Sequence, residues 1–119
     1  ALQDIISAIY ARPEGVVSAV CHGPAAFAHV KQPDGTYLIA GKAIAGFCND
    51  EEELFGKRWQ GEFPFLLEDK LKQRGGLYER AELMLPHVSV AGRLITGQNP
   101  YSTNGVAEAV VQALGKPVV

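Results

Sequence analysis

A cysteine and a histidine are adjacent in the stretch VVSAVCHGPAAF, which covers residues 16–27. A free thiol, with a pKa of about 8.5, is only slightly ionised at neutral pH, so a nucleophilic Cys21 needs groups that favour its thiolate. Backbone N–H groups at the start of a following helix and the ring of His22 could both do so. The pair predicts a nucleophile with a neighbouring proton carrier. The common alternative is a buried, purely structural cysteine.

The elements around this pair predict a sharp turn. Residues 16–20 are typical of a short buried strand, and Gly23 with Pro24 predicts a helix that has proline in its first turn. Cys21 would then lie on a strained strand-to-helix turn that exposes its side chain, as in a nucleophile elbow. The backbone amides of His22 and Gly23 are the expected donors to an oxyanion.

The rest of the chain alternates between helical and extended patterns. We expect helices over 2–9, 49–55, 64–73 and 102–116, strands over 37–40, 43–47 and both halves of 87–97, and a loop over 56–62. Such alternation predicts an α/β sandwich with a mainly parallel sheet.

One short helix precedes the strand of Cys21. A strand that presents a nucleophile from the carboxyl edge of a parallel sheet is usually central and needs neighbours on both sides. We therefore expect residues 1–119 to be the C-terminal part of one larger domain whose N-terminal strands lie outside this chain. A small complete α/β domain with an unusual strand order is the alternative.

The composition limits the class of protein. The 119 residues are 47% hydrophobic, carry a net charge of −2, and contain no cluster of basic and aromatic residues of the kind that binds nucleic acid. No apolar run approaches the roughly 18 residues of a membrane span, and the N-terminus lacks signal-peptide features. Cys21 and Cys48 show no metal-ligand spacing. We expect a cytoplasmic protein without metal, cofactor, nucleic-acid or membrane partner.

Four blocks resemble a known family. They are AVCHGPAAF, GKAIAGF with the acidic cluster after it, FPFLLEDKLKQRGGLYE and GRLITGQNPYSTNGVAEAVV. Their order and spacing are similar to those of the ThiJ/PfpI superfamily, of the class I glutamine-amidotransferase-like fold, and to its heat-shock glyoxalase III and chaperone branch. The resemblance implies a flavodoxin-like three-layer domain of about twice this length, commonly a homodimer.

The resemblance also implies roles for particular residues. The family's nucleophilic cysteine and the histidine after it match Cys21 and His22, and an acidic third member falls in CNDEEE, at Glu52 with Glu51 and Glu53 as alternatives. A further carboxylate and a glycine-rich loop come from the N-terminal half in this family. Cys48 stands where relatives often carry threonine.

The implied activity is a glutathione-independent glyoxalase, a lyase of the hydro-lyase type that converts a 2-oxoaldehyde such as methylglyoxal into its 2-hydroxy acid. A stress-related holding chaperone, an amidase or peptidase, and a sensor in which Cys21 is oxidised to a sulfinic acid are the alternatives.

Other residues keep two interpretations. Gln98 and Asn99 either border the pocket or shape the turn before the last helix. Trp59 and Phe63 either line a pocket mouth or partner surface or belong to the core. Cys48 and His87 are expected to be structural.

Overall fold

The computed structural model describes residues 1–55 and 63–115. Along the chain its elements are α1 (Leu2–Ala11), β1 (Val17–Val20), the 3-10 helix η1 (Gly23–Phe27), β2 (Ala43–Ile44), α2 (Asn49–Phe55), α3 (Leu67–Gln73), β3 (Leu77–Tyr78), β4 (Val88–Ala91), β5 (Leu94–Gly97), the 3-10 helix η3 (Pro100–Ser102) and α4 (Thr103–Ala113). The expected loop over 56–62, with Trp59, lies outside the described residues.

The main sheet has the order β1-β5-β4. β1 and β5 are parallel, with Val17 opposite Leu94 and Val20 opposite Gly97. β4 is antiparallel to β5 because a two-residue turn with Gly92 at φ 61° joins them as a hairpin. β2 and β3 form a second, parallel pair. The prediction of an α/β fold with mainly parallel strands is confirmed.

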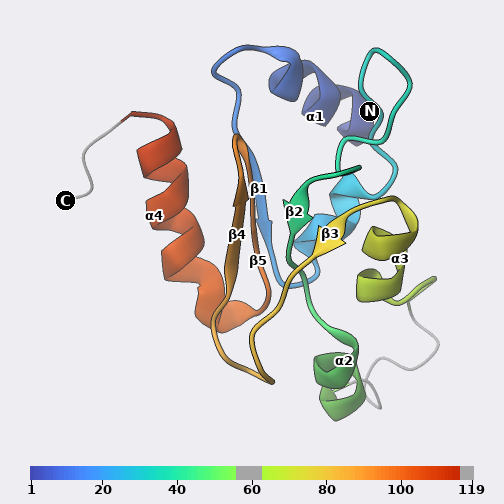
Figure 1. The fold of residues 1–119 in the computed structure, drawn as a ribbon, viewed down its shortest axis with the longest axis vertical. Coiled ribbons are helices and arrows are strands. Elements are labelled where there is room, and N and C mark those ends of the chain that lie inside the picture. Colours follow the sequence, from blue (N-terminus) through green and yellow to red (C-terminus); the bar gives the residue numbers. More distant parts are fainter. Residues whose placement is uncertain (56–62, 116–119) are drawn as a thin grey trace.

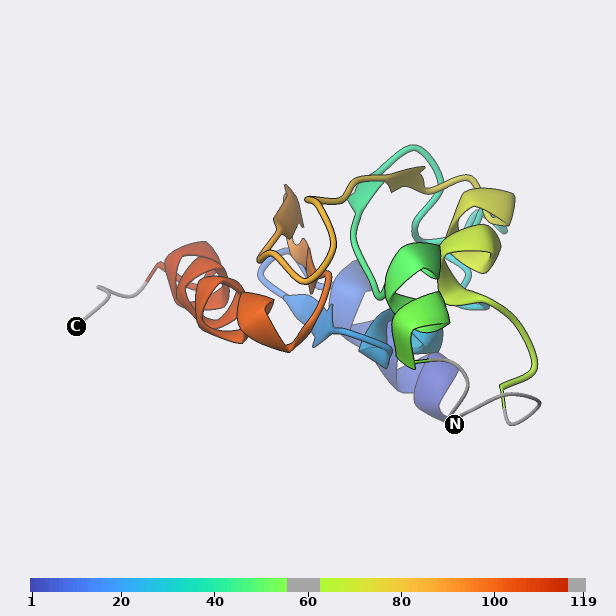
Figure 2. The ribbon, with the colours of Figure 1, turned by 90° about the horizontal axis from the view of Figure 1, so that it is seen from below.

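Helices and loops cover both faces of the main sheet (Figures 1 and 2). On one face α4 contacts all three strands. It approaches closely because position 97 is glycine: a Cβ there would lie 2.7 Å from the side chain of Val106. The opposite face is turned toward α1, η1 and the β2–β3 pair. The buried apolar core lies between these layers and includes Phe27, Leu38, Ile44, Leu71, Leu94 and Ile95.

The predicted helices over 2–9 and 49–55 are present, and the one predicted over 102–116 is present as α4, which begins at Thr103 and ends at Ala113. The helix expected over 64–73 begins only at Leu67, because 63–65 form bends and Leu66 has extended backbone. The helical segment after the elbow is a 3-10 helix of five residues.

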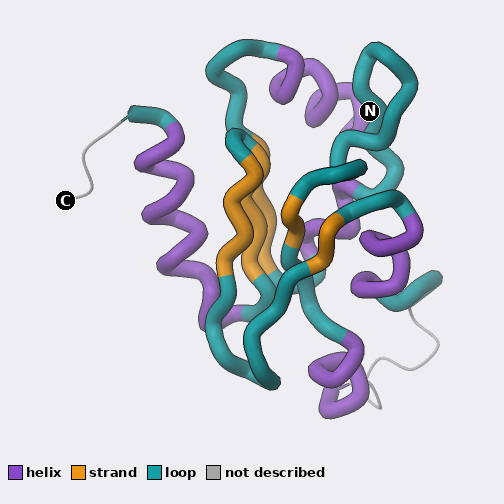
Figure 3. Tube along the Cα trace, in the orientation of Figure 1, coloured by secondary structure: helices purple, strands orange, loops and turns teal. Residues whose placement is uncertain are grey.

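The strand predicted over 37–40 is wrong. Leu38 and Ile39 are buried, as their hydrophobicity suggested, but the backbone forms consecutive turns in which Ala40 donates to the Tyr37 carbonyl and Lys42 to that of Ile39. The whole segment between η1 and β2 is irregular (Figure 3). The strand expected over 43–47 keeps only Ala43 and Ile44, and β3 was not expected.

β1 is at an edge of its sheet. Within 1–55 and 63–115, its strand partner is β5 alone, so its other edge is open. The exposed Ser18 lies on this strand. No helix of the described part is long and apolar enough to cross a membrane.

Candidate active site

Cys21 directly follows β1 and has a φ of 65°, in the left-handed region that non-glycine residues rarely adopt. Its backbone is held on both sides: its N–H donates to the Gly97 carbonyl at 3.0 Å, and its carbonyl accepts from the Phe47 N–H at 2.8 Å. The end of β5 and the segment after β2 thus stabilise the strained turn. The elbow predicted from the sequence is confirmed.

Glycine at position 23 makes the turn sterically possible. A Cβ there would lie 3.1 Å from the Ala19 Cβ, tighter than an ordinary van der Waals contact. Pro24 follows in the first turn of η1 and has no N–H of its own. The N–H groups that directly follow Cys21 in the elbow are therefore those of His22 and Gly23.

The structure brings Cys21, His22 and Glu52 together in a line. Nδ1 of His22 lies 3.6 Å from Sγ of Cys21, and Nε2 of His22 is hydrogen-bonded to Oε1 of Glu52. The arrangement fits the tautomer in which Nε2–H donates to the carboxylate and Nδ1 faces the sulfur as a proton acceptor. Of the three candidate glutamates, Glu52 is the one that meets the histidine, since Glu53 is exposed and Glu51 bonds elsewhere.

Two aromatic rings hold the imidazole of His22. The Phe63 ring is stacked on it, with centroids 5.1 Å apart and planes 22° apart, and the Phe47 ring contacts it at 4.5 Å with a 39° tilt. This packing restricts the rotation of the His22 side chain. Phe47 was not expected to belong to the site; the only sequence signal is its place at the end of GKAIAGF.

The thiol of Cys21 is half-buried. Burial raises its pKa, and the negative charges of Glu51 and Glu52 raise it further, whereas the backbone N–H of His22 acts in the opposite direction. The net direction is upward. Within residues 1–55 and 63–115, the His22 amide is the group that favours the thiolate, as expected of the elbow, and it is outweighed by burial and the two carboxylates.

A cavity of about 200 Å³ adjoins the histidine and Glu52. Most of its lining is apolar, and the residues that form it are His22, Ala25, Glu52, Phe63, Pro64, Phe65 and Leu67. Such a space suits a small molecule with few polar groups. Phe63 thus borders a cavity, one of the roles expected for it.

Gln98 and Asn99 are fully buried and are not among the residues that line this cavity. The Gln98 side chain accepts from the Ala81 N–H at 2.8 Å, and that of Asn99 donates to the Leu85 carbonyl at 2.8 Å. Of the two roles expected for them, the geometry favours shaping the turn. The buried Cys48 contacts Gln98 at 3.7 Å.

A second cluster, formed by Ser89, His87 and Glu79, has the residue types of a hydrolase triad. Ser89 Oγ donates to Glu79 at 2.7 Å and lies 3.1 Å from Nε2 of His87. The serine contacts both partners itself, so this is not the serine-histidine-carboxylate order of a nucleophile. No group of three or more potential metal ligands is found among the described residues.

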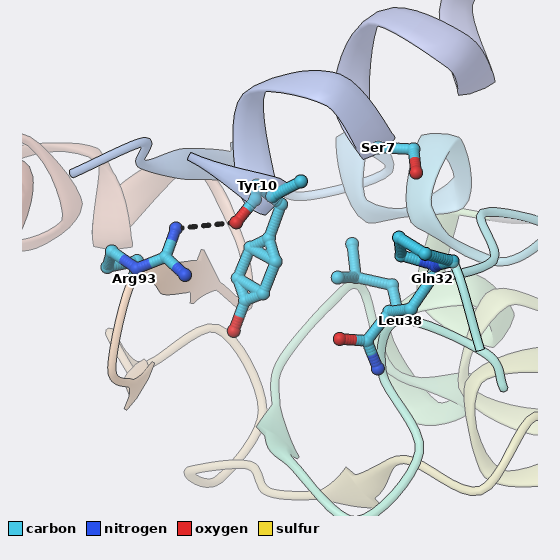
Figure 4. A pocket seen from close by; sticks show the side chains of 7 residues that line it. Ser7, Tyr10, Gln32, Leu38 and Arg93 are labelled. Atoms are coloured by element: carbon cyan, nitrogen blue, oxygen red, sulfur yellow. Dashed lines mark hydrogen bonds between the residues drawn. The ribbon is translucent and has the colours of Figure 1, made fainter. Parts of the chain in front are cut away.

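A hollow of about 360 Å³ lies between α1 and the loop after η1 (Figure 4). Two of its polar side chains, Ser7 and Arg93, have structural partners. The Ser7 hydroxyl donates to the Lys31 carbonyl, and the Arg93 guanidinium donates to the carbonyls of Tyr10 and Gly15. Arg93 thus ties the β4–β5 hairpin to the end of α1, a contact that stabilises the fold.

The chain is similar to several characterised proteins. It is 39% identical to "Glyoxalase 3" of Candida albicans over 116 residues, which are 94% of this chain and 49% of that protein. It is also 39% identical to "Glutathione-independent glyoxalase HSP31" of Saccharomyces cerevisiae, over 95% of this chain and 49% of the relative. No protein-family model matches the chain.

The chain is also similar to solved structures over about half of their length. The Rapid Encystment Protein of 24 kDa from Francisella tularensis superimposes with a TM-score of 0.87 at 37% identity, over 95% of this chain and 49% of that one. Glyoxalase III of Candida albicans gives 0.84 at 35% identity, over 93% and 48%. The chain spans about half the length of the relatives it matches. These similarities confirm the resemblance and the fold expected from the sequence.

Proposed function

We propose, from the homology of this chain to one half of the glutathione-independent glyoxalases of the ThiJ/PfpI superfamily, that it carries the nucleophile of such an enzyme. The substrate is a small 2-oxoaldehyde such as methylglyoxal, and the product is its 2-hydroxy acid. The observation that supports this most directly is the line formed by Cys21, His22 and Glu52 beside an apolar cavity.

The chemistry follows from the residues in that line. The sulfur of Cys21, as thiolate, adds to the aldehyde carbon, and the new oxyanion takes a proton to give a hemithioacetal. A base then moves the proton of this carbon to the neighbouring carbonyl carbon, and the hydroxyl proton passes to the oxygen of that carbonyl, which leaves a thioester on Cys21 and a hydroxyl on the neighbouring carbon. Water hydrolyses the thioester and releases the hydroxy acid and the thiol.

His22 is the proton carrier in this scheme. Its Nδ1 faces the sulfur, and its Nε2 is bonded to Glu52, which keeps the ring in one orientation and places a carboxylate beside it. The amides of His22 and Gly23 are the donors to the oxyanion of the addition step. A positioned base of this kind contributes about 100- to 10,000-fold.

In this proposal the remaining groups of the site come from the N-terminal half of the same domain. We infer that this chain is the C-terminal part of a single domain, whose N-terminal half supplies a second carboxylate, an oxyanion donor and the strands beside β1. The complete protein is then a cytoplasmic homodimer that needs no metal or other cofactor.

The test uses the complete protein with methylglyoxal and no thiol cofactor. We expect lactate to form in the wild type and not in Cys21→Ser, with both proteins folded alike by circular dichroism. A wild type that makes no lactate, while Cys21 is still alkylated by iodoacetamide, would contradict the proposal. Suppression of client aggregation that persists in Cys21→Ala would then favour the holding chaperone.

A further inference from the structure

Glu51, the residue before Glu52, is a carboxylate with no exposed surface. Its Oε1 accepts from the Cys48 N–H at 3.2 Å, and its Oε2 accepts from the Met84 N–H at 2.9 Å and from Nδ2 of Asn99 at 2.8 Å. These donors come from three separate segments: the start of α2, the β3–β4 loop and the turn after β5. Glu51 therefore joins three segments that are far apart in the sequence.

The partners of Glu51 are themselves fixed. The Asn99 side chain also donates to the Leu85 carbonyl and accepts from the Ser102 hydroxyl at 3.1 Å. Met84 has a φ of 61°, a conformation that a non-glycine residue keeps only where its surroundings hold it. Asn99 and the β3–β4 loop thus form a rigid base to which the carboxylate is attached.

The first turn of α2 depends on this attachment. α2 has only seven residues, too few for a helix to be stable by itself in water, so tertiary contacts must hold it. It lies beyond the carboxyl ends of β1 and β5, beside the elbow (Figure 1). Successive side chains on a helix point about 100° apart, so the direction of Glu51 determines that of Glu52.

We propose that Glu51 is the positioning residue of this site: by fixing the first turn of α2 to Asn99 and the β3–β4 loop, it directs the Glu52 carboxylate onto Nε2 of His22. The inference rests on the function proposed above. Glu51 does not take a proton from substrate itself, because it is fully buried and both of its oxygens already accept hydrogen bonds. Its charge raises the pKa of Cys21, so it is not placed there to activate the thiol.

A double-mutant cycle in the complete protein tests this role. Glu51→Gln keeps the shape of the side chain but presents an amide N–H to one of the three donors. We expect kcat for methylglyoxal to fall about tenfold with KM nearly unchanged, the size of effect expected when neighbours in one hydrogen-bond network are uncoupled. In the Glu52→Gln background the same substitution is expected to change kcat by less than about twofold.

The matched control is Glu53→Gln, which removes one negative charge from the exposed residue that follows Glu52 and is expected to leave kcat unchanged. Equal falls in both backgrounds, or no fall in either, would overturn the proposal, because Glu51 would then act independently of Glu52. If Glu51→Gln does not fold, Asn99→Ala, which keeps the carboxylate and removes one donor, is expected to show the same dependence on Glu52.

A second readout separates this inference from the proposed function. The ¹⁵N resonance of His22 Nε2 reports its bond to Glu52 whether or not the protein is active on methylglyoxal. We expect Glu51→Gln to shift this resonance toward its position in Glu52→Gln, and Glu53→Gln to leave it in place. An unshifted resonance in Glu51→Gln would refute the positioning role even if lactate formation is confirmed.

Discussion

Replacing Glu52 by glutamine changes the site with little change of shape. The neutral amide oxygen can still accept a hydrogen bond from Nε2–H of His22, so the ring keeps its orientation and tautomer. What is lost is the negative charge beside the imidazole at the moment when it holds the proton in transit. The substitution therefore tests the electrostatic role of Glu52 separately from its packing.

The size of the effect follows from burial. The Glu52 side chain is 10% exposed, so its bond to His22 is little weakened by solvent. A hydrogen bond to a charged group contributes about 1.5–3 kcal/mol and one between neutral groups about 0.5–1.5 kcal/mol, so losing the charge while keeping the bond costs about 1–1.5 kcal/mol. Since about 1.36 kcal/mol corresponds to tenfold in rate, kcat is expected to fall about 5- to 13-fold.

The same substitution has the opposite effect on the thiol. The charge of Glu52 raises the pKa of Cys21, so its removal lowers that pKa and increases the thiolate fraction at neutral pH. Iodoacetamide should alkylate Cys21 of Glu52→Gln faster than the wild type at pH 7, while lactate forms more slowly. Slower alkylation would refute the inference that the Glu52 charge raises the pKa of Cys21. An unchanged kcat would refute the electrostatic role of Glu52 in turnover.

Three further outcomes are expected. Cys21→Ser should abolish turnover without lowering the melting temperature. Burial acts to raise the pKa of the Glu51 carboxyl, but its hydrogen bonds outweigh burial and hold this pKa below its ordinary value. The charged Glu51 therefore stabilises the fold above the pKa that it has in the unfolded chain, and this stabilisation is lost as the pH falls through its lower pKa in the folded state. Urea unfolding should therefore show Glu51→Gln less stable than wild type at pH 7, with a smaller difference near pH 3. Arg93→Ala removes the bonds to the Tyr10 and Gly15 carbonyls and should cost about 1.5–3 kcal/mol of unfolding free energy, measured by urea titration, with kcat unchanged.

Much of the site could be predicted because its geometry is local. Cys21 and His22 are neighbours in the chain, and the change from a valine-rich strand to Gly-Pro fixes the turn between them. Glu52 needed the family pattern, since three consecutive glutamates are equivalent by composition. Only the rotation of α2 decides which of them faces the histidine, and that rotation depends on partners in distant segments such as Asn99.

What could not be predicted depends on long-range contacts. Leu38 and Ile39 have the hydrophobicity of a buried strand, yet local backbone bonds place them in turns, because burial alone does not require pairing. β3 has only two residues, Leu77 and Tyr78, and forms because Ala43 and Ile44 lie beside them. So short a strand has no periodicity of its own.

The raised pKa of Cys21 and the open edge of β1 both support the proposal that this chain is one part of a larger domain. In the described part, the elbow has burial and two carboxylates that disfavour the thiolate, and one amide that favours it. The strand carrying the elbow has β5 on one side only. If the strands of the N-terminal half pair with the open edge of β1, they also end beside Cys21, since carboxyl ends of parallel strands share one edge of a sheet. The groups that lower the thiol pKa would then come from the half that completes the sheet, and Cys21 should react with iodoacetamide more slowly at pH 7 in this chain alone than in the complete protein.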